Sequence, residues 1–69
     1  MLTMAPIKDK LRDARRRAAL TQGELADKSG VGITTITRIE SGHITEPRVS
    51  TLRKLATALD LEPRELLED

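Results

Sequence analysis

Residues 22–41, QGELADKSGVGITTITRIES, constrain the fold of this chain more than any other stretch. Thr21 precedes them and Glu24 follows Thr21 by three residues, which is the spacing of a reciprocal capping box at the start of a helix. Gly30 suits the end of that helix, because glycine adopts a left-handed backbone conformation without steric cost. Gly32 can then serve as the N-cap of a second helix. The stretch therefore predicts two short helices joined by a tight turn.

Apolar residues occur in this stretch where two crossing helices would face each other. Ala26 is small and permits a close crossing, and Gly30 makes the turn. The residues expected to hold the pair together are Leu25, Val31, Ile36 and Ile39. We interpret residues 22–41 as a helix-turn-helix.

The outer face of the second helix favours recognition of a DNA major groove. Successive helical residues rotate by about 100°, so with Ile36 and Ile39 facing inward, Thr34 and Arg38 point in nearly the opposite direction. Arginine can pair with the O6 and N7 atoms of guanine, hydroxyls can meet bases or phosphates, and an aliphatic side chain can contact the thymine methyl. A solvated face of a structural helical hairpin is the alternative. The residues of this outer face are Thr34 and Arg38, flanked by Thr37 and Ser41, with Ile33 and Thr35 near the exposed N-terminal end.

Several motifs together resemble the phage-repressor and Cro-like helix-turn-helix family, also called the xenobiotic-response-element type. They are an arginine in the first helix, T-Q-x-x-L-A, I-x-x-I-E-x-G and L-x-x-L-A-x-A-L, and the similarity extends from Leu11 to Leu67. The resemblance implies an all-α, compact five-helix, lambda-repressor-like domain over residues 1–69, with its helix-turn-helix at 22–41. It also implies a sequence-specific double-stranded DNA-binding transcriptional regulator, a repressor, whose third helix reads the major groove.

The resemblance assigns roles to individual residues. Arg15 would pair with Glu40, the glutamate that ends the recognition helix; an ordinary surface arginine is the alternative. Gln22 would contact the DNA backbone or brace the residue that begins the recognition helix. The residues expected near bases are Ile33, Thr34, Thr37 and Arg38, and those expected at the backbone are Gln22, Thr35, His43 and Arg48.

Composition excludes several classes of function. The chain of 69 residues has no cysteine and one histidine, so a thiolate metal site, a disulfide framework and a histidine cluster are excluded, and we expect neither an enzyme nor a bound cofactor. The absence of Phe, Trp and Tyr argues against recognition of single strands by stacked bases. No apolar run reaches membrane-spanning length and no targeting signal is recognisable, so we expect a cytoplasmic protein with no membrane partner.

Charge is distributed unevenly along the chain. Residues 1–23 carry six basic and two acidic side chains, whereas residues 60–69 carry one basic and five acidic ones. One end therefore suits phosphate and the other repels it, although uneven surface charge is common.

Three further helices are expected outside the central pair. The first begins near Pro6, a residue favoured at the first helical position, with an apolar stripe of Ile7, Leu11, Ala14 and Ala18. The fourth begins at Arg48 or Ser50, with an apolar face of Val49, Leu52, Leu55, Ala56 and Leu59. The fifth begins at Pro63.

Two classes of partner remain open besides DNA. A monomer contacts few bases, so a homodimer on an inverted repeat is expected, with Leu61, Leu66 and Leu67 either forming the dimer surface or completing the core. Alternatively, the chain is a protein-interaction module such as an antitoxin that neutralises a partner toxin, with or without DNA binding. A purely structural helical bundle is the third interpretation.

Overall fold

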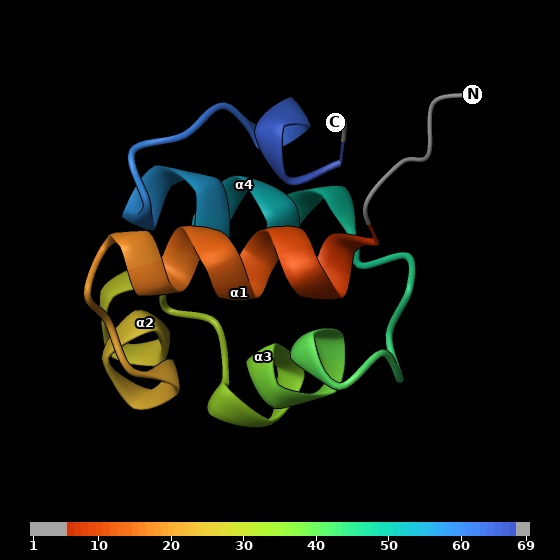
Figure 1. The fold of residues 1–69 in the computed structure, drawn as a ribbon, viewed down its shortest axis with the longest axis horizontal. Coiled ribbons are helices and arrows are strands. Elements are labelled where there is room, and N and C mark those ends of the chain that lie inside the picture. The colour runs from red at the N-terminus through yellow and green to blue at the C-terminus, as the bar shows by residue number, and fades with distance from the viewer. Residues whose placement is uncertain (1–5, 68–69) are drawn as a thin grey trace.

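The computed structural model describes residues 6–67, which form four α-helices and one short 3-10 helix (Figure 1). The elements are α1 (Ile7–Arg17), α2 (Gln22–Ser29), α3 (Ile33–Glu40), α4 (Val49–Ala58) and the 3-10 helix η1 (Pro63–Leu66). No strand occurs in the described part of the chain. The all-α class predicted from the sequence is confirmed.

The fifth helix expected from Pro63 is present as a single 3-10 turn, so four of the five helical elements are α-helices. Glu65 N–H bonds the Glu62 carbonyl and Leu67 N–H bonds the Arg64 carbonyl, both with the three-residue spacing of a 3-10 helix. Such tight helices are used in short pieces. The start of η1 is acidic, and Glu62 and Glu65 form a reciprocal capping box there.

The helices surround one small core (Figure 1). α1 packs against α3 and η1, α2 packs against both α3 and α4, and η1 lies on α4. All the main elements contribute to the fully buried set, which consists of Leu11, Leu25, Ile36, Ile39, Leu55 and Leu66. Burying one such side chain stabilises the fold by about 1.5–3 kcal/mol. The inward positions predicted for the helix-turn-helix therefore hold α3 against the rest of the domain.

Local chemistry sets the ends of α2 and the start of α3 as the sequence predicts. Thr21 Oγ1 accepts from Glu24 N–H at 3.0 Å, and Glu24 Oε1 accepts from Thr21 N–H at 2.8 Å. Gly30 ends α2 with φ of 76°, and Gly32 is the N-cap of α3. These contacts confirm the predicted helix-turn-helix.

Ser29 is the last residue of α2, immediately before the turn. Its Oγ accepts a hydrogen bond from Val31 N–H at 3.1 Å. The hydroxyl therefore satisfies a backbone donor in the turn, and the polar residue is compatible with the motif.

Two expected boundaries and two expected apolar positions differ from the structure, and one of these positions, Ala18, is exposed as the C-cap of α1. Pro6 is the N-cap and Ile7 is the first residue of α1, so Pro6 does not occupy the first helical position. α4 begins at Val49, between the two starts considered, with Arg48 as its N-cap. Val49 is 62% exposed rather than part of the core. Periodicity alone does not reveal this exposure.

Candidate nucleic-acid interface

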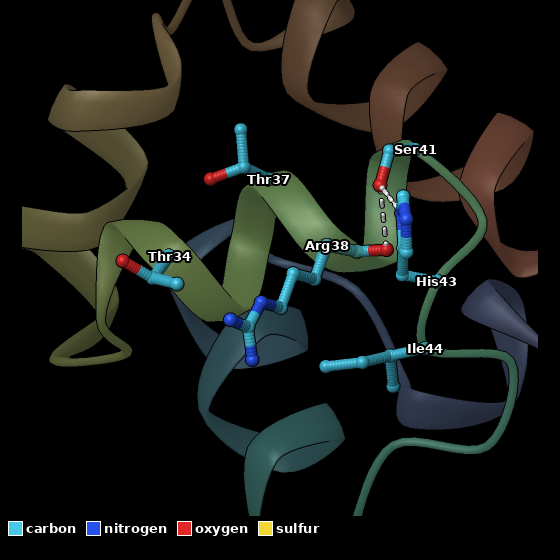
Figure 2. A pocket seen from close by; sticks show the side chains of 6 residues that line it. All are labelled: Thr34, Thr37, Arg38, Ser41, His43 and Ile44. Carbon is cyan, nitrogen blue, oxygen red and sulfur yellow. Dashed lines mark hydrogen bonds between the residues drawn. The ribbon is translucent and has the colours of Figure 1, made fainter.

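A shallow depression of about 550 Å³ lies on the outer face of α3 and the loop that follows it (Figure 2). Polar side chains and one isoleucine line it: Thr34, Thr37, Arg38, Ser41, His43 and Ile44. The opposite face of α3 carries Ile36 and Ile39, which are fully buried. Burial of these two isoleucines fixes the rotation of α3 about its axis and turns the threonines and Arg38 toward solvent.

Thr37 offers an acceptor rather than a donor at this surface. Its Oγ1–H donates to the Ile33 carbonyl, one turn earlier in the same helix. A hydroxyl has a single proton and two lone pairs, so a molecule approaching from outside meets the lone pairs and the methyl group of Thr37. These groups suit the amino group of a base and an apolar base edge.

The N-terminal end of α3 adds apolar surface beside this depression. Ile33 is 50% exposed although it is a large aliphatic residue. Its Cδ1 lies near Gly23 at the start of α2. A Cβ atom added to Gly23 would be 3.8 Å from Ile33 Cδ1, which is ordinary van der Waals contact. Ile33 is therefore supported from one side and open on the other.

An ion pair fixes the C-terminal end of α3 to α1. Arg15 Nε donates to Glu40 Oε2 at 2.7 Å, and Arg15 Nη2 donates to Glu40 Oε1 at 2.9 Å. Arg15 Nη1 also donates to the Leu20 carbonyl at 2.9 Å. Parallel bonds between guanidinium and carboxylate are directional as well as strong. Arg15 thus joins α1, the α1–α2 loop and α3.

Gln22 also donates a hydrogen bond to the Glu40 carboxylate. Its Nε2 donates to Glu40 Oε1 at 3.2 Å, so the structure places Gln22 against the last residue of α3, not the first. Burial of the carboxyl alone would raise the pKa of Glu40. The hydrogen bonds from Arg15 and Gln22, and the positive charges of Arg15 and Arg12, outweigh that effect and hold the Glu40 pKa below its ordinary value of 4.5.

The loop after α3 is attached to the helix through one carbonyl. The Arg38 carbonyl accepts from His43 N–H at 2.9 Å and from Ile44 N–H at 3.1 Å. Gly42 makes this turn possible with φ of 88°, a conformation that favours glycine. His43 is consequently held beside the outer face of α3.

The sequence-predicted residues fall into two groups around this surface. Four of them line the depression, namely Thr34, Thr37, Arg38 and His43. Thr35 is half-buried, and Arg48 is exposed at the start of α4, outside the depression. Ser41 and Ile44 also line it but were not among the predicted site residues. Helical spacing does place Ser41 on this outer face, as expected from the sequence, since it follows Thr34 by seven residues and Thr37 by four.

None of the helices within residues 6–67 has the length and hydrophobicity that crossing a bilayer requires.

Comparison with known proteins identifies relatives of this arrangement. The family model described as helix-turn-helix matches residues 11–66. The uncharacterised HTH-type transcriptional regulator RghRB of Bacillus subtilis is 38% identical over 64 residues, which are 93% of this chain and 46% of RghRB. The chain thus spans about half the length of that curated relative.

Two solved structures share the fold. The structure of SinR, described as the master regulator for biofilm formation, in complex with DNA has a TM-score of 0.87 and 29% identity, covering 90% of this chain and 98% of that one. The DNA-binding domain of the P22 c2 repressor has a TM-score of 0.87 and 25% identity, covering 97% and 87%. The resemblance inferred from the motifs is confirmed, and the chain belongs to the phage-repressor and Cro-like helix-turn-helix family.

Proposed function

We propose that this chain is a sequence-specific, double-stranded DNA-binding transcriptional regulator that acts as a repressor, with α3 inserted in the major groove. The observation that carries the proposal is the division of α3 into two faces. Ile36 and Ile39 are fully buried, whereas Thr34, Thr37 and Arg38 are exposed around one depression. A helix presented in this way fits the width of the groove.

Each exposed residue of α3 has a distinct role in the proposed complex. Arg38 is the base-reading cation, suited to guanine. Thr37 accepts from a base amino group, since its proton is engaged by Ile33. Ile33 and the methyl of Thr34 supply apolar contact with a base edge such as the thymine methyl.

Residues around α3 fix its register on the backbone. Phosphate contacts position a protein on the duplex without reading sequence. We assign this role to Thr35, His43 and Arg48, and to Gln22 through the Nε2 hydrogen that Glu40 does not use. The basic residues of the first 23 positions add a favourable long-range field.

A homodimer would give the domain enough base contacts for useful specificity. Two copies would read half-sites about 34 Å apart on an inverted repeat. Leu67 is 45% exposed and Leu61 is half-buried, so both are available for a dimer surface. Leu66 is 1% exposed and belongs to the core. We therefore propose that the dimer forms through Leu61 and Leu67.

Selection of labelled duplexes from a randomised pool, at near-physiological salt, tests this function. We expect enrichment of an inverted repeat with half-sites one helical turn apart. Binding without enrichment would reduce the interaction to its sequence-independent electrostatic component. Absence of binding would contradict the proposal and favour a protein partner such as a toxin.

Variants of the selected complex then test the role of Arg38. Arg38→Ala should cost about 1–3 kcal/mol on the selected site and relax preference at one base position. Arg53→Ala is the matched control, because it removes an exposed arginine from α4 outside the depression. An equal loss of affinity on every sequence would reassign Arg38 to a phosphate.

A further inference from the structure

Ser41 lies between the end of α3 and the loop that follows, and its hydroxyl contacts both (Figure 2). Ser41 Oγ is 2.8 Å from Nδ1 of His43 and 3.1 Å from the Arg38 carbonyl oxygen. Ser41, Arg38 and His43 all line the depression on the outer face of α3. The hydroxyl is therefore placed to control a side chain of the proposed interface.

The number of available protons decides which way the hydroxyl points. Serine has one hydroxyl proton, and a carbonyl oxygen has two lone pairs. The Arg38 carbonyl already accepts from His43 N–H at 2.9 Å and Ile44 N–H at 3.1 Å. The proton of Ser41 therefore goes to Nδ1 of His43, the shorter of its two contacts. A neutral imidazole that accepts at Nδ1 carries its own proton on Nε2.

The same arrangement also accommodates a protonated imidazole. In the imidazolium both ring nitrogens are donors, so Nδ1–H would donate to Ser41 Oγ. The hydroxyl proton would then turn to the Arg38 carbonyl at 3.1 Å, with no movement of heavy atoms. Nε2 of His43 carries a proton in either state.

We propose that Ser41 is a positioning residue that holds His43 with its Nε2–H available as a hydrogen-bond donor to a phosphate oxygen of bound DNA. This inference rests on the proposed function. A phosphate oxygen accepts hydrogen bonds only, so an imidazole with an unprotonated Nε2 would face it without a bond. Because the Arg38 carbonyl already accepts from two N–H groups, donation from Ser41 to Nδ1 disfavours that state in the neutral ring, and the charged ring carries a proton on Nε2 as well.

The tautomer can be measured in the free protein, without DNA. The chain has a single histidine, so all imidazole signals in a long-range proton–nitrogen correlation spectrum of isotope-labelled protein belong to His43. We expect the neutral ring to be protonated at Nε2 in the wild type and to become a mixture of tautomers in Ser41→Ala. A neutral ring protonated at Nδ1, or a tautomer ratio unchanged by Ser41→Ala, would overturn the assignment.

Affinity for the selected duplex tests the role at the interface. Ser41→Ala and His43→Ala should each weaken binding about threefold to tenfold, in line with one hydrogen bond. The double variant should lose little more than His43→Ala alone, because Ser41 acts through His43. Ser41→Thr keeps the hydroxyl and should retain wild-type affinity.

Thr57→Ala is the control, since it removes an exposed hydroxyl from α4, outside the depression. Ser41 is itself exposed, so all variants should keep the wild-type melting temperature. Additive losses from Ser41→Ala and His43→Ala would show that the two residues contact DNA independently and would overturn the positioning role. If the wild type binds no duplex, the proposed function fails, while the tautomer in the free protein still decides whether Ser41 controls His43.

Discussion

Arg15 and Glu40 are separated by 25 positions in the sequence, yet two bonds of 2.7 and 2.9 Å join their side chains across the interface of α1 and α3. Glu40 is only 7% exposed, and no buried side-chain nitrogen or oxygen within residues 6–67 lacks a hydrogen-bond partner. A buried charge is tolerated when it is paired and hydrogen-bonded. The pair therefore specifies how the recognition helix sits on the domain.

Removal of Arg15 should destabilise the fold while leaving base preference intact. Arg15→Ala leaves the Glu40 carboxylate buried without its main partner, a change that costs about 3–5 kcal/mol. The measurement is urea-induced unfolding, and Arg17→Ala on the exposed side of α1 is the matched control. An unchanged melting temperature for Arg15→Ala would reject this role.

Stability should decrease in acid because of Glu40. Its pKa is lower in the folded protein than its ordinary value of 4.5, so the unfolded chain binds the proton more readily. The stabilisation is therefore complete above about pH 4.5 and is lost as the pH falls through the folded-state pKa.

Unfolding free energies of wild type and Glu40→Gln across this range isolate the effect. The difference in unfolding free energy between the two proteins should narrow toward low pH, because protonation of Glu40 removes the charge that glutamine lacks. The pKa of Glu24 is also lowered, through its bonds to Thr21, but Glu24 is present in both proteins and its contribution cancels. A gap that stays constant with pH would contradict the prediction.

Replacement of Ala19 by glycine should stabilise the protein. Ala19 has φ of 58° in the α1–α2 connection, where an L-residue with a Cβ atom is disfavoured by about 1–2 kcal/mol. Ala19→Gly removes that cost, less the greater entropy of glycine in the unfolded chain, so we expect a gain of about 0.5–1 kcal/mol. Ala18→Gly, at φ of −81°, should instead destabilise. Thermal unfolding distinguishes the two adjacent changes.

Two consecutive leucines at the end of the described chain should respond differently to truncation. Leu66 is fully buried against the core, so Leu66→Ala should cost about 2–5 kcal/mol. Leu67→Ala removes an exposed side chain and should change stability by about 0.5 kcal/mol or less. If Leu67 belongs to the dimer surface, its truncation should instead weaken the concentration-dependent association measured by sedimentation. Equal destabilisation by both changes would contradict the burial of Leu66 alone.

Local chemistry explains which parts of this fold the sequence could predict. The capping box of Thr21 and Glu24 and the glycine at position 30 depend on neighbours a few residues away, and both appear as expected. The inward isoleucines of α3 follow from helical periodicity. These features need no knowledge of what packs against them.

The remaining features depend on contacts between distant segments. Val49 continues the apolar periodicity of α4, but its side chain is 62% exposed. Gln22 meets Glu40 because α2 begins beside the end of α3, a distance of 18 positions in the sequence. Ser41 gains its partner from the path of the following loop. Periodicity assigns a face to each residue, whereas its partner depends on the tertiary arrangement.

Arg38 connects base recognition with phosphate recognition. Its side chain is the base reader of the proposed complex, while its carbonyl anchors the loop through His43 N–H and Ile44 N–H. Any shift of α3 along the groove would carry the loop with it. A wrong base opposite Arg38 would therefore also disturb the phosphate contact proposed for His43 in the loop. Discrimination between DNA sites would then exceed what the Arg38 side chain alone could supply.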